Sequence, residues 1–193
     1  MSKIIFATSN PDKMQIATSV CSTFDIKVEF VRLDIDEIQG EDAEVIVRDK
    51  AKRAYEQLNM PVVVSDDSWD IKALNGFPGA YMKSINYWFK PEDFIRLMSS
   101  IKDRRVTLHQ YLAYTDGNIT EVFTNDLNGV IVSKPRGKVE RAPCMEVVEF
   151  DFDEGLTLAE VFNKQDDQLM AKRYRKHPDA WHEFAKWYKS TAR

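Results

Sequence analysis

Apolar and polar positions over the first 64 residues predict strands that alternate with helices. A continuous apolar run at Ile4–Ala7, followed by the small polar residues of Thr8–Pro11, predicts a buried strand that leads directly into a helix. Apolar residues alternate with charged ones over Ile26–Val31, which predicts a half-exposed strand. Helical spacing from Asp42 to Leu58 and the β-branched run Val62–Val64 predict another helix and another buried strand. Strand, helix, strand order of this kind favours parallel pairing with right-handed crossovers.

The remainder of the chain predicts a more antiparallel part. Val106–Thr115 and Ile119–Phe123 are expected to pair as a hairpin, because Asp116-Gly117 between them is a strong turn signal. Leu74–Gly79, which contains glycine and proline, predicts a compact loop, and Pro91 is expected to start a helix. Further strands are expected at Leu127–Val132 and Glu146–Phe152, with helices at Thr157–Glu160 and Pro178–Ser190. The predicted class is α/β, in which a βαβ half joins a more antiparallel half.

Composition places the chain among ordinary globular proteins. Its 193 residues are 44% hydrophobic and 30% charged, which suits one large domain or a single domain with two lobes. Because 31 acidic residues outnumber 27 basic ones, for a net charge of −4, generic nucleic-acid binding is disfavoured. Cys21 and Cys144 lack metal or redox spacing and are expected to be buried thiols in a reducing compartment. Since no run of about 18 apolar residues occurs, we expect a cytoplasmic chain that is neither secreted nor membrane-spanning.

The first candidate site is the predicted junction of the first strand and the first helix. Backbone N–H groups at such a junction, together with the side chain of Lys13, point at one spot and can bind an anion such as a phosphate. Thr8, Ser9 and Asn10 are the other substrate-binding candidates in this segment. The alternative is helix capping, which is the more frequent use of such residues.

The second candidate site combines acidic residues from two segments. Asp66-Asp67-Ser68 directly follows Val62–Val64 and is therefore expected at the carboxyl end of that strand, where open α/β sheets bind ligands. Neighbouring carboxylates there can bind Mg²⁺ and orient a water molecule, although a solvated turn explains the same residues equally well. The acidic loop from Asp34 to Asp42 could bring one further carboxylate to the ion.

Other features could contact a ligand. Lys83 follows the Leu74–Gly79 loop and could reach a phosphate, and Trp69, which we expect inside the acidic turn, could stack on a base. His109 lacks metal-ligand spacing and is expected to pack rather than react. A basic cluster precedes the last predicted helix, although such clusters are more often solvated surface. Its members are Lys172, Arg173, Arg175, Lys176 and His177.

Four segments, taken together and in order, resemble the inosine triphosphate pyrophosphatase family. They are Phe6-Ala-Thr-Ser-Asn-Pro-Asp-Lys13, Glu37-Ile-Gln-Gly-Glu41, Val64-Ser-Asp-Asp-Ser68 and Ala73-Leu-Asn-Gly-Phe-Pro-Gly79, with later echoes at Pro135-Arg136-Gly137 and Thr157-Leu-Ala-Glu160. The resemblance implies an elongated mixed sheet with flanking helices, forming one two-lobed domain over residues 1–193 around a central nucleotide cleft. It also implies a Mg²⁺-dependent homodimeric enzyme that converts ITP, dITP or XTP to the monophosphate and pyrophosphate.

The resemblance implies a role for each matching position. Lys13, Lys50 and Lys83 resemble phosphate-binding lysines of the family, and Glu37 resembles its metal-binding glutamate. For the essential aspartate, counting back from Ala73-Leu74 selects Asp66, whereas the local Asp-Asp-Ser pattern selects Asp67. We therefore expect Mg²⁺ to be bound by Glu37, Asp66 and Asp67. Catalysis is then expected from an aspartate that positions or deprotonates water, together with Lys13.

The segments that would read the base depart from the family pattern. Where family members carry a Gly-Phe-Gly-Tyr-Asp-Pro-like segment, this chain reads Gly137-Lys-Val-Glu-Arg-Ala-Pro-Cys-Met145, and Ala171-Lys-Arg-Tyr-Arg-Lys-His177 replaces a Ser-His-Arg motif. A common or modified (deoxy)nucleotide is therefore a second possible substrate. Two further functions stay open, a catalytically weak nucleotide-binding or regulatory protein and an interaction module for acidic partners. The expected substrate contacts in this part are Ser68, Trp69, Lys172, Arg173 and His177.

Overall fold

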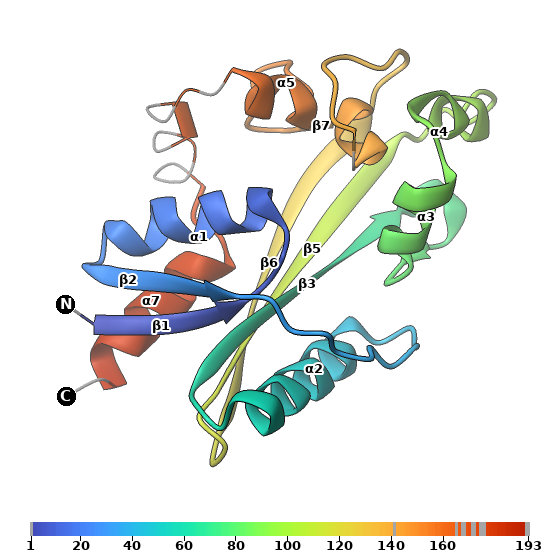
Figure 1. Cartoon of the computed structure of the whole chain (residues 1–193). Helices are drawn as coiled ribbons and strands as arrows, with labels where there is room; N and C mark the ends of the chain where they lie inside the picture. The colour runs from blue at the N-terminus through green and yellow to red at the C-terminus, as the bar shows by residue number, and fades with distance from the viewer. Residues whose placement is uncertain are drawn as a thin grey trace. The chain divides into compact units, whose positions relative to one another are not determined.

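The computed structural model describes residues 2–140, 142–164, 166, 169, 170, 173 and 177–191, which divide into two compact units (Figure 1). The first unit consists of the described residues among 2–66, 110–125 and 174–191, and the second of those among 67–109 and 126–173. Strands β3 (Val62–Ile71), β5 (Arg105–Thr115) and β6 (Thr120–Ile131) each contribute residues to both units.

The strands form a mixed sheet. β1 (Ser2–Ala7) pairs in parallel with β2 (Ile26–Val31) along its whole length and with β3 at its carboxyl end. β4 (Phe77–Gly79) is antiparallel to β3, and β7 (Val148–Phe150) is antiparallel to β6. The strand order is β2, β1, β3, β5, β6, β7, with β4 attached to β3. The predicted α/β class with a mixed sheet is therefore confirmed.

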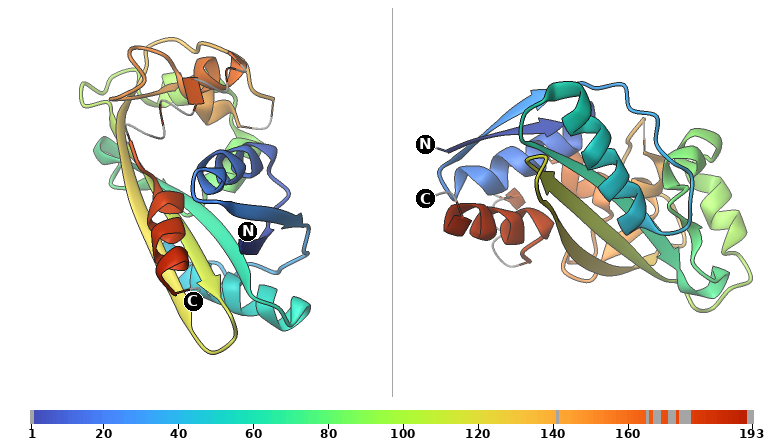
Figure 2. Two further views of the ribbon diagram at one scale, coloured as in Figure 1. Left: turned by 90° about the vertical axis from the view of Figure 1, so that its left-hand side faces the viewer. Right: turned by 90° about the horizontal axis from the view of Figure 1, so that it is seen from below.

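Helices cover both faces of the sheet in the first unit. α2 (Ala43–Leu58) packs on one face, where its Val47 and Ala51 join Val62 and Val64 of β3 in a buried cluster. α1 (Pro11–Ser22) and α7 (Ala180–Thr191) lie on the other face (Figure 2). The ring of Phe6 in β1 lies 4.8 Å from that of Trp181 in α7. Strand residues in this unit therefore face α2 or α1 and α7 alternately.

The second unit has a separate core. It contains α3 (Met82–Trp88), α4 (Pro91–Leu97), α5 (Leu158–Asn163) and the short 3₁₀ helices η1 (Lys72–Leu74) and η2 (Pro143–Glu146). α5 begins with the predicted capping box, in which Thr157 and Glu160 bond to each other's backbone. The core combines residues of β3, α4, β5, β6 and β7, including Trp69, Ile71, Phe94, Met98, Val106 and Phe150.

The predicted end of the strand at Val64 is wrong. β3 continues to Ile71, so Asp66-Asp67-Ser68 lies inside a strand and not in a turn at its end. The strand accommodates these polar residues because Trp69 and Ile71, further along it, are buried to 4% and 0% exposure and anchor it in the second core. Adjacent aspartates in a strand point to opposite faces, which matters for the site.

The predicted break between Phe123 and Leu127 is also wrong, because β6 is one strand. Its polar middle finds partners on β5: Asn125 Nδ2 donates to Gln110 Oε1 at 3.2 Å, and Asp126 Oδ1 lies 2.7 Å from His109 Nδ1. β7 is shorter than predicted because η2 occupies the residues before it, and α3 is a helix that the sequence analysis missed. Among the described residues, no helix combines the length and apolar character needed to cross a bilayer.

Candidate active site

The junction between β1 and α1 is a closed hydrogen-bonded cap. Asn10 Oδ1 accepts hydrogen bonds from the backbone N–H groups of Asp12 at 2.9 Å and Lys13 at 3.4 Å. The Thr8 hydroxyl accepts one from the Asn10 N–H at 3.2 Å. Two of the amides that would bind an anion are thus bonded within the chain, and capping is the direct role of Asn10. Ser9, which is exposed, and the Lys13 ammonium are the ligand-binding candidates that this geometry favours.

Asp12 places an acid in the first turn of α1. Burial raises the pKa of its carboxyl. A helix N-terminus favours a negative charge, so here desolvation outweighs the helix dipole. A carboxyl that gives up charge more readily repels a nearby phosphate less than an ordinary aspartate would.

Glu37 and Lys50 form an ion pair between the acidic loop and α2. Lys50 Nζ lies 2.8 Å from Glu37 Oε1 and donates a second hydrogen bond, of 3.2 Å, to the backbone oxygen of Ser65 in β3. The side chains of Lys50 and Glu37 are 16% and 25% exposed, so the pair is shielded without being fully buried. One ammonium thus joins three segments that the sequence analysis assigned to a single site.

Strand geometry separates Asp66 from Asp67. Val62 and Val64 belong to the cluster that α2 covers, and alternation places Asp66 on the same face of β3. Asp66 therefore faces the side of the sheet from which Lys50 approaches. Asp67 lies on the opposite face, and its charge is a minor contributor, behind burial, to the rise of the Cys144 thiol pKa to about 12.

Glu37 and Asp66 suit Mg²⁺ by their chemistry. Both offer carboxylate oxygens, and Mg²⁺ is commonly held by one or two carboxylates together with substrate phosphates and water. Over the part of the chain that the structure describes, no three His, Cys, Asp or Glu side chains gather into a metal site. The residues present therefore fit an ion that arrives with a nucleotide better than an ion held by protein ligands alone.

The other predicted contacts in the second unit differ in exposure. Ser68 and Trp69 are 7% and 4% exposed, and the Trp69 ring lies 6.4 Å from that of Phe150 within the core. The predicted position of Trp69 in an open turn is wrong, because β3 continues through it and directs the indole inward. Lys83 is exposed on α3.

Arg173, the described arginine of the basic cluster, forms a buried ion pair. Its Nε and one terminal nitrogen donate to the two carboxylate oxygens of Asp153 at 2.7 and 3.2 Å, and the side chains are 8% and 2% exposed. The guanidinium carbon also lies 4.7 Å from the centre of the Phe152 ring. The expectation that Arg173 belongs to a solvated basic face is therefore wrong. His177 is exposed, and Lys172, Arg175 and Lys176 lie outside the described residues.

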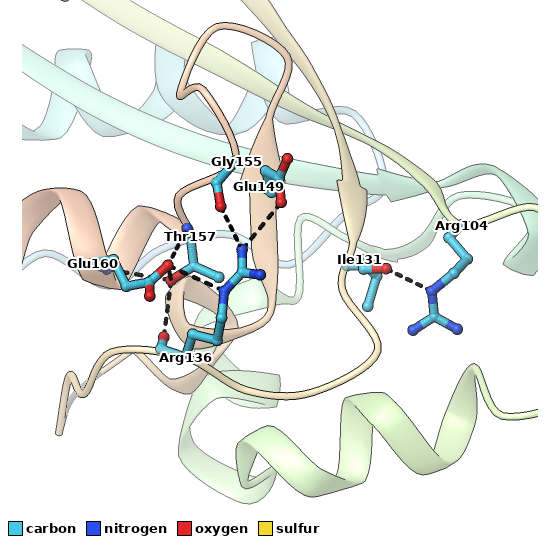
Figure 3. A network of polar contacts seen from close by, with 7 residues as sticks. All are labelled: Arg104, Ile131, Arg136, Glu149, Gly155, Thr157 and Glu160. Atoms are coloured by element: carbon cyan, nitrogen blue, oxygen red, sulfur yellow. Dashed lines mark hydrogen bonds and ion pairs between the residues drawn. The ribbon is translucent and has the colours of Figure 1, made fainter.

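A polar network in the second unit gives a structural role to the two later echoes (Figure 3). Arg136 donates to the carboxylates of Glu160 and Glu149, each at 3.1 Å, and to the backbone oxygen of Gly155 at 2.8 Å. The Thr157 hydroxyl donates to the backbone oxygen of Arg136 at 2.9 Å. The network fastens the loop after β6 to β7 and to the start of α5.

Arg104, also drawn in Figure 3, closes the other end of that loop. Its guanidinium donates to the backbone oxygens of Ile131 and Val132, both at 2.6 Å, and of Met98 at 3.1 Å. The sequence analysis missed this residue, because a single arginine between a helix and a strand carries no pattern that marks a clamp.

A sequence model of the Ham1 family matches residues 4–169. The chain belongs to the Ham1 family. The dITP/XTP pyrophosphatase of Methanopyrus kandleri is 30% identical over 189 residues, which are 97% of each protein. The inosine triphosphate pyrophosphatase of Tuber melanosporum is 31% identical over 176 residues, 89% of this chain and 91% of that protein.

Solved Ham1 structures share the fold. A HAM1 protein from Coxiella burnetii superposes with a TM-score of 0.76 at 18% identity, covering 99% of this chain and 100% of that one. The Staphylococcus aureus Ham1 protein gives 0.73 at 20% identity, covering 98% and 99%. The resemblance found in the sequence is confirmed, and with it the enzyme class of this Ham1-family chain, a nucleoside triphosphate pyrophosphatase.

Proposed function

We propose that this Ham1-family chain hydrolyses non-standard purine nucleoside triphosphates, ITP, dITP or XTP, to the monophosphate and pyrophosphate with Mg²⁺ as cofactor. The names of relatives that align over nearly the whole chain support this substrate class. The observation that carries the proposal is the Glu37–Lys50 ion pair on Ser65. It holds an acid and a base of opposite charge beside the strand position that precedes Asp66.

The reaction sets clear demands on side chains. Water attacks the α phosphorus, the bond to the bridging oxygen breaks, and pyrophosphate leaves with the added negative charge. Lys13 and Lys83 neutralise the phosphates, while Asp66 positions the attacking water and accepts its proton. Mg²⁺ bound by Glu37 and Asp66 would supply further charge neutralisation. His177 and Ser68 are the other described residues that we assign to substrate contact.

Asp66 is the better candidate for the essential aspartate. It shares the α2 face of β3 with the approach of Lys50, whereas Asp67 points to the opposite face, toward Trp69 and Cys144. Counting from Ala73-Leu74 selects the same residue. Asp67 is thereby assigned a supporting role in the local charge.

A substrate panel tests the function directly. Purified chain and Mg²⁺ are incubated with ITP, dITP, XTP and the common triphosphates, and products are separated by anion-exchange chromatography. We expect monophosphate and pyrophosphate from the non-standard purines, and no product after the metal is removed with EDTA. Release of orthophosphate would contradict cleavage at the α phosphorus, and binding without turnover would favour the weakly catalytic alternative.

We also propose that the chain is a cytoplasmic homodimer. The resemblance implies the dimer, and exposed aromatic area supports it: Tyr87 and Trp88 at the end of α3 are 86% and 68% exposed. Light scattering coupled to size-exclusion chromatography measures the mass in solution. A mass of one chain at micromolar concentration would reject the dimer.

A further inference from the structure

We infer that Lys50 is a positioning residue, which holds the Glu37 carboxylate against β3, and not a direct ligand of the substrate phosphates. The inference deepens the proposed function, and its catalytic consequence rests on that function. The contacts that carry it exist without nucleotide: Lys50 Nζ lies 2.8 Å from Glu37 Oε1 and 3.2 Å from the Ser65 oxygen.

The ammonium of Lys50 is committed to the protein. It has three N–H donors, and two of them are directed to Glu37 and Ser65. With 16% of its side chain exposed, Lys50 sits where attraction to a carboxylate is stronger than it is in open water. Turning the ammonium toward a phosphate would break both contacts and leave Glu37 without this partner.

The acidic loop needs such an anchor because residues 32–42 contain no helix or strand. α2 holds the loop at two points on one side. Gln57 donates to the backbone oxygen of Asp34 at 2.9 Å, and Lys50 pairs with the Glu37 side chain. Gln57 and Lys50 are seven residues apart, which places both on the same face of the helix. Gln57 thus fixes the backbone of the loop, and Lys50 fixes the carboxylate.

The two roles for Lys50 predict different defects. Residues that orient a metal ligand typically contribute about 10–100-fold to activity or metal affinity. A lysine that binds phosphate equally in the ground state and the transition state would instead raise KM for the nucleotide with kcat unchanged. Lys52, on the same helix but 74% exposed and 3.9 Å from Glu56, is a matched control.

The first experiment needs neither metal nor nucleotide. Urea unfolding is measured for Lys50→Met, Glu37→Gln and the double variant, with Lys52→Met as control. We expect each single variant to lower the unfolding midpoint, the double variant to fall no further than the worse single one, and the control to match wild type. Additive shifts would overturn the inference, because they would mean that the two side chains do not act on each other.

The second experiment separates positioning from phosphate binding by kinetics on whichever triphosphate is turned over. Lys50→Met is expected to lower kcat about 10–100-fold with KM for the nucleotide changed less than about 3-fold. Lys50→Arg should recover part of the loss, and Lys13→Met should raise KM. A rise in KM for Lys50→Met equal to that of Lys13→Met, with kcat unchanged, would overturn the inference. A wild type that turns over no triphosphate would refute the proposed function, while the unfolding cycle would still decide whether Lys50 holds Glu37.

Discussion

At the scale of single residues, the order Asp66-Asp67 offers a matched pair of carboxylates that differ only in the face of β3 to which they point. Asp66→Asn is expected to lower kcat about 10²–10⁴-fold, because it removes the group that positions water and accepts the proton. Asp67→Asn removes the same charge from the opposite face and should cost far less. Steady-state pyrophosphate release measures both, and an inactive Asp67→Asn beside an active Asp66→Asn would reverse the assignment.

Burial decides what a charge contributes at Arg173. Asp153→Asn should destabilise the chain by about 3–5 kcal/mol, because it leaves the buried guanidinium without its counter-charge. The exposed pair of Lys186 and Glu183, 58% and 56% exposed, is the control, and Glu183→Gln should cost less than about 1 kcal/mol. Urea unfolding gives both values. Equal small losses would show that the Arg173–Asp153 pair is not desolvated in solution.

The two cysteines carry a pH prediction. Burial, with a smaller effect of Asp179 on Cys21, raises the pKa of the Cys21 thiol from 9.0 to about 12, and burial raises that of Cys144 to about 12 as well. Because the folded pKa lies above the unfolded one, stability is fully present below pH 9 and falls as the pH rises toward 12. A thiol reagent at pH 8 should label native protein very slowly and urea-unfolded protein at once. Fast labelling of either cysteine in native protein would contradict its burial.

At the scale of elements, the caps of the helices could be predicted and the course of some strands could not. Asn10, Asp42 and Thr157 were assigned as helix-start residues from local pattern alone, because a cap bonds to backbone within three residues of itself. β3 and β6 run past their predicted ends because distant partners decide their length. Trp69 enters the second core, and Asp126 finds His109 across the hairpin.

The same distinction applies to the site. The sequence marked Glu37, Lys50 and Asp66 as functional candidates, yet no pattern could show that Lys50 bonds to Glu37 or which aspartate shares its side of the sheet. Those facts depend on how α2 packs against β3. Arg136 and Arg104 were missed as clamps for a similar reason, since their partners are mostly backbone oxygens and acids from other segments.

The cap of α1 can be tested as an element. Asn10→Ala should lower the free energy of unfolding by about 1 kcal/mol, because it strips the acceptor from the Asp12 and Lys13 amides. Asn10→Ser keeps a capping oxygen and should restore most of that loss. Thermal unfolding measures the difference. If Asn10→Ala left stability unchanged and raised only the KM for nucleotide, Asn10 would be a substrate contact and not a cap.

At the scale of the whole molecule, a cofactor that binds with its substrate should stabilise the fold only when both are present. Ligand at about 1,000 times its Kd adds about 4 kcal/mol to the folded state, which for a chain of this length corresponds to a rise in Tm of roughly 8–16 °C. We expect that rise with Mg²⁺ plus a non-hydrolysable nucleotide. Either one alone should have a much smaller effect, because Glu37 and Asp66 provide only part of the coordination.

Glu37→Gln separates this expectation from a general effect of ions on stability. The substitution keeps the shape of the side chain and removes the carboxylate charge, so the Tm rise with Mg²⁺ and nucleotide should shrink, and EDTA should then change little. Lys52→Met on the exposed side of α2 should keep the full rise. An undiminished rise in Glu37→Gln would mean that the ion is bound elsewhere. The link between the acidic loop and the reaction would then be lost, even though the Ham1 fold and the Lys50 contact to Ser65 would stand.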